Sequence, residues 1–466
     1  MKAIAATLCA LALLQGGPSI VDHPRQLRTP PLRPFVPPEL TRLKLESGAQ
    51  LLVIENKELP LVDGVLIFRG GVAQESRAQA GLTELLAEVL REGGSERTSG
   101  LDLDDWLDTH AASIDVRSEP DSLRIEFSCV KDDLGTVLVF IGELLLLPAY
   151  PAEELEFSRT RMLSRLARAA QDPALLADRS LAQITAGTGG ANAHQPTEES
   201  VRSIERADLL LHHRRLLGTD RLLVGATGAV NPSSLAARFD SLLSTVPNVG
   251  PLPSPSTKVF RVPGRRTIYV LDRPGMERCE IRLAAPGTRR LDSDYVPLSL
   301  WSYANGYGGT SNRLMVRLRS ELGLAFEGSL YFQPEWDRSG RLFGACSARV
   351  DKVGQVLSTC IELLQAARDP LPAPELEAVR QRMLNAEVFQ IDSAQEVLER
   401  ALKLEFHGYP SEFWTRRDAR LRQLSAEQVA LAVKRHLDPS RLVVVVVGPA
   451  EKLAEALAPL GTLVRL

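Results

Sequence analysis

The sequence lacks a long hydrophobic run: no segment beyond the N-terminus has about 18 uninterrupted apolar residues, the minimum for a membrane helix. It also lacks a marked excess of charge, with 55 Lys and Arg against 58 Asp and Glu and a formal net charge of -3. No electrostatic feature therefore indicates a nucleic-acid partner. At 466 residues the chain is too long for one simple core, so two or more domains are expected.

Cysteine is scarce, with five residues in the whole chain. Four of them follow the N-terminal segment, and none forms a C-x-x-C pair, which argues against a metal or redox motif of that kind. Two alternatives remain open: one disulfide in an oxidising compartment, or buried free thiols. These four residues are Cys129, Cys279, Cys346 and Cys360.

The N-terminus carries the features of an export signal. A short basic start, an apolar run and then small residues follow one another between Met1 and Gly17, which predicts a cleavable signal peptide over residues 1–20. A secreted or periplasmic protein is expected. A lipoprotein is less favoured, because the large Leu8 precedes Cys9. Residues 21–40 are rich in Pro and Arg and predict an extended lead-in.

The rest of the chain divides into two similar halves. The breaker-rich residues 246–257 predict a linker between an N-terminal domain at 41–245 and a C-terminal domain at 258–466. Two pairs of segments recur at an offset of about 220 residues, which indicates duplication of one domain. The pairs are Glu154–Leu163 with Glu375–Leu384 and Asp220–Gly228 with Ser440–Gly448.

Hydrophobic periodicity predicts both strands and helices in each half. Partly alternating runs predict strands, and runs with the longer period predict helices such as 134–147 and 153–170. The fold class is therefore α+β, with two tandem layered domains, each a mostly antiparallel sheet with helices packed on one side. The glycine-bearing stretch 169–194 is expected to be a mobile surface loop. The predicted strands are 50–54, 61–68 and 123–130.

One segment, Gly81-Leu-Thr-Glu-Leu-Leu-Ala-Glu-Val-Leu-Arg-Glu-Gly-Gly94, resembles the inverted zinc motif H-x-x-E-H of the pitrilysin/insulinase metallopeptidases. In that register Glu84 replaces the first His, Ala87 the catalytic Glu and Glu88 the second His. Catalytic zinc needs imidazoles on one helix face, and Ala87 cannot take a proton from a zinc-bound water. No zinc is expected in this chain. Glu84 and Glu88 share a helix face, so a weak hard-cation site is the alternative to the favoured reading of two solvated carboxylates.

The family's third zinc ligand is also missing. It is a Glu about 75 residues further on, and the matching segment here is Met162–Pro173, with Ser164 and Arg165 at the candidate positions. Neither is a plausible zinc ligand. No H-x-x-x-H or H-x-x-E-H spacing occurs among the histidines, which are His23, His110, His194, His212, His213, His407 and His436.

A second block, Leu318–Phe326, resembles the family pattern L-R-x-x-x-G-L-A-Y. The resemblance implies that Arg319 orients substrate in a partner's active site. Phe326 replaces a Tyr and retains at most a packing role, because it cannot donate a hydrogen bond to an oxyanion. Gly308 and Gly309 precede this block in a stretch similar to the family's G-G-x-x-S-R-L, which implies a substrate-facing loop. The alternative for Arg319 is a surface ion pair with Glu321 or another acid.

The resemblance extends from about residue 40 to the end and implies a clam-like chain of two similar domains. It implies a degenerate, non-catalytic member similar to the inactive subunits of heterodimeric processing peptidases. Such a subunit pairs with an active zinc metallopeptidase homologue, which holds the only zinc, or with itself, and binds unfolded peptides. The rival hypothesis is a secreted peptide-binding or envelope scaffold protein with no role in proteolysis. An unrecognised enzyme is least favoured, because no Ser/His/Asp or Cys/His arrangement can be inferred from spacing.

Overall fold

The computed structural model describes residues 37–186, 195–252 and 260–466. The predicted signal segment, most of the predicted lead-in and part of the predicted linker lie outside these ranges. Residues 38–466 form one compact unit. No helix in the described ranges is long and apolar enough to cross a membrane.

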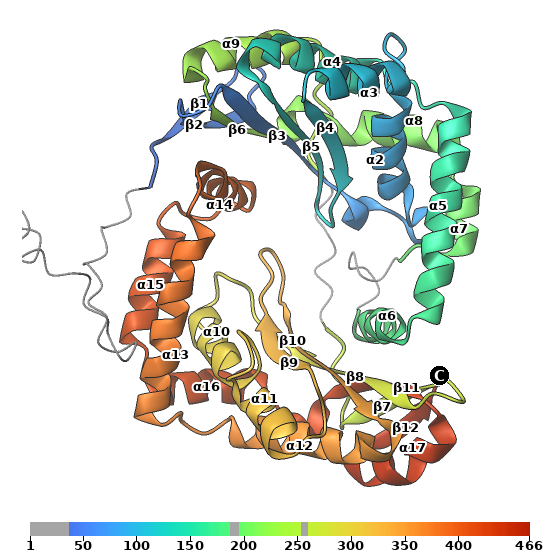
Figure 1. Ribbon diagram of the computed structural model, residues 1–466, viewed down its shortest axis with the longest axis vertical. Helices are drawn as coiled ribbons and strands as arrows, with labels where there is room; N and C mark the ends of the chain where they lie inside the picture. The colour runs from blue at the N-terminus through green and yellow to red at the C-terminus, as the bar shows by residue number, and fades with distance from the viewer. Residues whose placement is uncertain (1–36, 187–194, 253–259) are drawn as a thin grey trace, which may run out of the picture. The chain divides into compact units, whose positions relative to one another are not determined.

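The first half contains a six-stranded sheet with the order β1-β2-β6-β3-β5-β4 (Figure 1). Its strands pair antiparallel except for β2 and β6, which are parallel. The strands are β1 (Leu40–Lys44), β2 (Gln50–Glu55), β3 (Leu61–Arg69), β4 (Ser113–Ser118), β5 (Ser122–Val130) and β6 (Leu222–Gly228). The helices are α2 (Leu82–Gly93), α3 (Gly100–Thr109), α4 (Leu134–Leu146), α5 (Ala152–Gln171), α6 (Pro173–Thr185), α7 (Glu198–Ser203), α8 (Arg206–Leu216) and α9 (Pro232–Leu243).

The second half contains another six-stranded sheet, with the order β12-β7-β11-β8-β10-β9. Here β7 pairs parallel with both β11 and β12, and the other pairs are antiparallel. The strands are β7 (Thr267–Asp272), β8 (Arg278–Pro286), β9 (Gly328–Gln333), β10 (Arg341–Arg349), β11 (Val443–Gly448) and β12 (Thr462–Arg465). The helices are α10 (Tyr295–Asn305), α11 (Arg313–Met315), the π-helix η7 (Val316–Glu321), α12 (Val353–Ala366), α13 (Ala373–Ala386), the 3-10 helix η9 (Glu387–Gln390), α14 (Ala394–Phe406), α15 (Phe413–Gln423), α16 (Ala426–His436) and α17 (Ala450–Leu457).

The two sheets repeat one topology. Five strands follow the same order in both, β2-β6-β3-β5-β4 and β7-β11-β8-β10-β9, and the recurring sequence segments lie in the corresponding strands β6 and β11 and helices α5 and α13. The sixth strand differs: β1 precedes β2 and pairs antiparallel, whereas β12 comes from the end of the chain and pairs parallel. The predicted α+β class with two similar, mostly antiparallel layered halves is confirmed.

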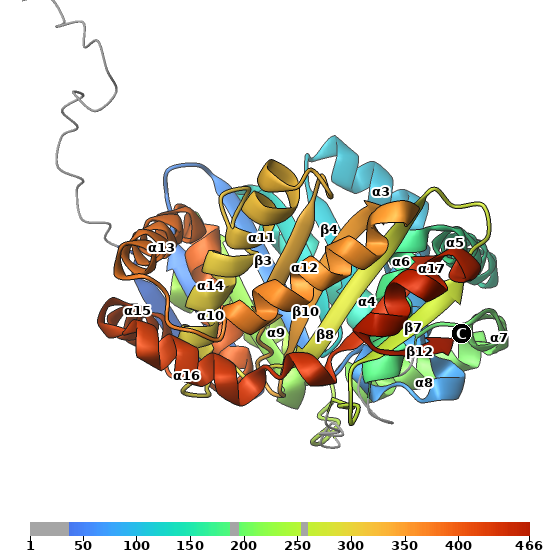
Figure 2. The ribbon, with the colours of Figure 1, turned by 90° about the horizontal axis from the view of Figure 1, so that it is seen from below.

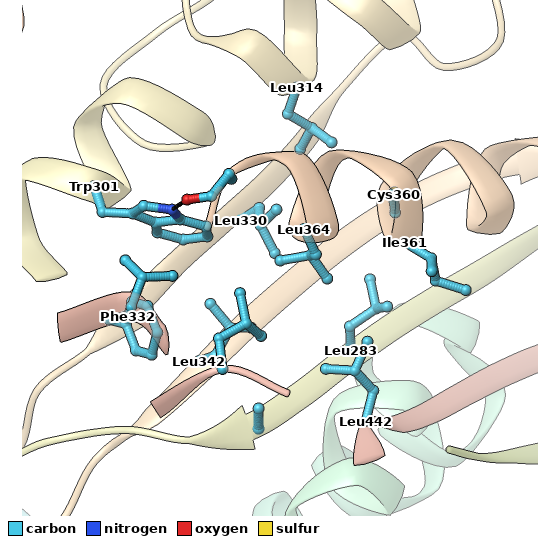
Figure 3. Close-up of a cluster of buried hydrophobic side chains, with 14 of the residues drawn as sticks. Leu283, Trp301, Leu314, Leu330, Phe332, Leu342, Cys360, Ile361, Leu364 and Leu442 are labelled. Atoms are coloured by element: carbon cyan, nitrogen blue, oxygen red, sulfur yellow. Dashed lines mark hydrogen bonds between the residues drawn. The ribbon is translucent and has the colours of Figure 1, made fainter. Parts of the chain in front are cut away.

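Each half has its own hydrophobic core between the sheet and the helices of that half. In the second half, α12 and α17 lie against the sheet (Figure 2). Trp301 is fully buried there beside Phe332 and Leu364, and its indole N–H donates to the carbonyl of Ala367 at 2.8 Å (Figure 3). Burial of each large apolar side chain contributes roughly 1.5–3 kcal/mol. The indole hydrogen bond removes the cost of burying the polar end of the ring.

The other face of each sheet is covered by a helix from the opposite half. Helix α14 contacts β2 and β6 of the first sheet, with Leu398 and Leu402 buried against that face (Figure 1). Helix α6 contacts β8 and β11 of the second sheet, with Leu181 buried there. The central strands are therefore buried on both faces, which explains the continuous apolar run 443–447 in β11.

One of the loop predictions is wrong. Within 169–194, helix α5 continues to Gln171 and α6 occupies Pro173–Thr185, while residues 187–194 lie outside the described ranges. The turn between the helices is an N-cap: the Asp172 carboxylate accepts the backbone N–H groups of Ala174 and Leu175, and Pro173 is the first helical residue. The glycines of this stretch follow α6 in the sequence, so they do not exclude a helix that begins at Pro173.

Candidate functional site

Helix α2, which carries the altered zinc motif, is anchored at its N-terminus by a buried carboxylate. Glu75 accepts the backbone N–H groups of Gly81 at 2.8 Å and Thr83 at 2.6 Å. Burial raises the pKa of Glu75, although these hydrogen bonds from Thr83 and Gly81 oppose the shift. Gly81 has φ +101°, a conformation that favours glycine. The start and the direction of α2 are thus fixed.

The apolar face of α2 enters the core, which turns its acidic face toward α5. The Arg165 guanidinium of α5 donates to Glu84 at 2.8 Å and to Glu88 at 2.7 Å, through one nitrogen. Arg161, one turn earlier on α5, also bonds Glu88, at 3.2 Å. Burial raises the pKa of Glu84, while Arg165 lowers it and Glu88 raises it. The two carboxylates are therefore ion-paired, and the expectation that they are simply solvated is wrong.

These residues do not fit a zinc ion. Arg165 places a positive charge between the positions that correspond to the two His ligands, and carboxylates occupy those positions. Ala87 is buried in the core, so it presents no group to the face. Of the two candidates for the third ligand position, Ser164 is exposed and Arg165 faces α2. A hard-cation site at Glu84 and Glu88 would have to displace the guanidinium.

In the second half, the residues singled out from the sequence lie on and around the π-helix. The Arg319 guanidinium stacks over the Phe326 ring, 4.7 Å from its centroid, and both side chains are exposed, Phe326 by 71%. The alternative of an ion pair with Glu321 is not formed, because Glu321 accepts from Arg317 at 2.7 Å. Residues four apart face each other on a helix, whereas residues two apart do not.

The glycine segment before the π-helix has the backbone that its sequence requires. Gly308 has φ +82° and Gly309 has φ +100°, so both occupy the left-handed region. Asn312 ends the turn, because its side-chain oxygen accepts the backbone N–H of Met315 at 2.9 Å and caps the following helix. A Cβ at Gly309 would meet no atom within 4 Å, which leaves its backbone open.

A polar cluster that the sequence did not indicate joins the two halves. His407, at the end of α14, lies 2.9 Å from Asp337 through Nδ1 and 3.9 Å from Asp121 through Nε2. Trp336 stacks on the imidazole with ring centroids 5.0 Å apart. His407, Asp337 and Asp121 are far apart in the sequence, and their spacing matches no metal-ligand motif. Each carboxylate faces a different imidazole nitrogen, so His407 links the end of α14 to Asp337 and to the β4–β5 turn.

The cysteines follow the buried-thiol alternative. All four are buried and unbridged in the described ranges. Burial, with nearby carboxylates, raises the pKa of Cys129 and of Cys279 to about 11. These thiols therefore stay protonated and unreactive at neutral pH.

The chain is similar to proteins that are described as inactive relatives of peptidases. Residues 203–383 match the family model described as Peptidase M16 inactive domain. The chain is 24% identical over 414 residues to the non-peptidase homolog YmxG of Helicobacter pylori, covering 87% of this chain and 93% of that protein.

Two solved structures have the same fold. The peptidase M16 inactive domain from Pseudomonas fluorescens has a TM-score of 0.77 at 22% identity, covering 88% of this chain and 98% of that one. The periplasmic protease PqqL from Escherichia coli has a TM-score of 0.74 at 15% identity, covering 96% of this chain and 50% of that one. Together with the altered motif and the duplicated sheets, these similarities support a degenerate member of the pitrilysin-like M16 peptidase family.

Proposed function

We propose that this protein is a non-catalytic subunit that pairs with an active zinc metallopeptidase homologue and helps to bind and orient unfolded peptides. The observation that carries the proposal is the exposed stack of Arg319 on Phe326, beside the open glycine turn. In the same chain, the Arg165 guanidinium lies where a zinc ion would have to bind. Zinc, in this proposal, belongs to the partner.

Arg319 has the properties expected of a peptide-orienting group. No carboxylate lies within ion-pair distance of it among the described residues. The Phe326 ring holds the planar guanidinium in one orientation, which reduces the entropy lost when it engages a ligand. A fixed guanidinium donates charge-assisted hydrogen bonds to a peptide carbonyl.

An extended peptide also has a surface to pair with. Strand β4 is the edge of the first sheet and contacts α2, so its outer backbone groups lie next to the altered motif. Addition of an extended segment to a sheet edge is a common mode of peptide recognition. The Phe326 ring lacks the hydroxyl that would stabilise an oxyanion, so in this proposal the chain orients peptides and leaves catalysis to its partner.

The proposed location is extracytoplasmic. The signal-like N-terminus predicts export, and PqqL, a protein with the same fold, is a periplasmic protease. An unfolded peptide from the cell envelope would then be the substrate class.

The test is an affinity pull-down of the tagged mature chain from its extracytoplasmic extract, followed by reconstitution. We expect a stoichiometric partner with an intact H-x-x-E-H motif, whose peptide turnover rises when this chain is added. Arg319→Ala should cancel the rise, and Arg317→Ala, which removes an exposed guanidinium from the same π-helix, should preserve it. Recovery of the chain alone, or of unrelated envelope proteins, would instead favour the scaffold hypothesis. Peptide cleavage by the dialysed chain with stoichiometric zinc would contradict both.

A further inference from the structure

A cavity of about 650 Å³ lies in the second half, beside the glycine turn, since its lining residue Tyr307 directly precedes Gly308. Its walls come from α10, α13, α14, α15 and the segment from β9 to Trp336. This volume is within the range of about 300–1,000 Å³ that small-molecule sites occupy. All the residues that line it belong to the described part of the chain.

One wall of the cavity is aromatic. The rings of Tyr303, Tyr307 and Tyr331 follow one another with centroid distances of 5.0 and 5.2 Å. Trp336 and Trp414 also line the cavity and lie 6.2 Å apart, edge to face. Such ring faces and edges favour a flat apolar group as the occupant.

The cavity also carries an excess of positive charge, because four cationic side chains line it against two carboxylates. Arg400 and Arg417 both pair with Glu387 and both stack on Trp414, at 4.4 and 5.0 Å. Burial acts to raise the pKa of Glu387, but Arg417 and Arg400 outweigh it and hold that pKa below its usual value. One carboxylate is thus shared by two guanidinium groups.

The other two cations, Arg290 and Lys403, have no carboxylate within ion-pair distance in the described ranges. Arg290 lies over the Trp336 ring at 4.5 Å and donates to the Tyr295 hydroxyl at 3.1 Å. Two cations without counter-charges therefore border a cavity with aromatic walls. An anionic group on a ligand would complement them.

We propose that this cavity binds a ligand that carries both an aromatic group and a carboxylate. Two sources offer that chemistry: the C-terminal aromatic residue of a peptide, or a free aromatic acid. The site goes beyond the proposed function because it needs no peptidase partner. Binding is measured on this chain alone, so failure here leaves the partner proposal standing, and the reverse also holds.

The probes are the peptide Gly-Gly-Ala-Phe with a free carboxylate, its C-terminal amide, Gly-Gly-Ala-Ala and 3-phenylpropionate, titrated by calorimetry. Tryptophan fluorescence provides a second readout, since Trp336 and Trp414 are two of four tryptophans. We expect the free acid to bind at least about tenfold more tightly than the amide and the Ala-ending peptide. Binding of phenylpropionate as tightly as the peptide would identify small aromatic acids as the source; binding of the peptide alone would identify peptide ends.

Variants separate the ionic role from a structural one. Lys403→Gln and Arg290→Gln should reduce the preference for acid over amide, while Lys434→Gln, an exposed lysine of α16 outside the cavity lining, should leave it unchanged. Lys403 is exposed, so its variant is expected to fold, which circular dichroism checks. Equal affinity for acid and amide, no binding by any probe up to about 10 mM, or an unchanged preference in both pocket variants would overturn the proposal.

Discussion

At the scale of single residues, Arg165 determines what helix α2 can do. Its guanidinium contacts Glu84 and Glu88 together, across a sequence separation that no local pattern reveals. The sequence predicted an altered motif at Glu84, Ala87 and Glu88 but left Ser164 and Arg165 as equal candidates for the position of the third zinc ligand. The structure separates them by orientation, because only Arg165 faces the motif.

This orientation predicts which substitutions would restore a metal site. The triple variant Glu84→His, Glu88→His and Arg165→Glu should bind one zinc per chain, because it places two imidazoles at i and i+4 opposite a carboxylate. Two comparison variants carry the same two histidines, and one keeps Arg165 while the other has the carboxylate at position 164 through Ser164→Glu. Both should bind zinc more weakly than the triple variant, by more than the roughly 10- to 100-fold that loss of a supporting group costs. Metal analysis after dialysis checks this. Equal zinc binding by the two carboxylate placements would contradict the assignment. Peptidase activity should stay absent, since Ala87 supplies no base.

At the scale of secondary-structure elements, the contact of α14 with β6 predicts a coupled pair of substitutions. A Cβ at Gly225 would lie 2.5 Å from Cδ1 of Leu402, so Gly225→Ala should destabilise the protein by about 1–3 kcal/mol. Leu402→Ala should cost about 2–5 kcal/mol by leaving a cavity. The double variant should lose less than the sum by more than about 0.5 kcal/mol, because the new methyl group partly fills the cavity. Urea unfolding measures all three.

The matched control uses α6, the helix of the first half that packs against the second sheet. Leu181 of α6 is equally buried, but against the second sheet, far from Gly225. Leu181→Ala combined with Gly225→Ala should therefore be additive. If the effects of Gly225→Ala and Leu402→Ala were also additive, α14 would not pack closely against β6.

The elements themselves were largely predictable, for reasons that can be named. The strands at 50–54, 61–68 and 123–130 appeared through their hydrophobic patterns, and β2, β3 and β5 lie there. The glycines that follow helix α6 favoured a loop over the whole stretch, although Asp172 and Pro173 together are a signal for the start of a helix. The sequence did not show that Glu321 pairs with Arg317, because the distinction between neighbours two and four apart depends on the helical backbone of residues 316–321.

At the scale of the whole molecule, the repeats predicted two similar halves. They did not predict the exchange of helices, in which α14 of the second half covers the first sheet and α6 of the first half covers the second sheet. Periodicity shows that a helix has an apolar face and does not show which sheet that face covers. One signal was available: the uninterrupted Val443–Val447 run indicates a strand covered on both faces, and a helix from the other half is what covers it. Buried arginines mark both contacts, with Arg124 pairing Glu399 of α14 and Arg282 pairing Asp178 of α6, each at 2.6 Å.

This exchange predicts that neither half is stable alone. A fragment of residues 37–252 lacks α14, so the apolar face formed by Leu52, Ile54 and Leu223 would meet water. A fragment of residues 260–466 lacks α6 and exposes the corresponding face of β11. Each fragment by itself should aggregate or unfold without cooperativity, because exposed sheet faces of this kind associate. Coexpressed, the two should elute as a 1:1 complex and unfold in one transition, since each supplies the helix that covers the other's sheet. Size-exclusion chromatography and thermal unfolding measure this, and a monomeric 37–252 fragment that unfolds cooperatively would show that the exchanged helices are accessory to the fold.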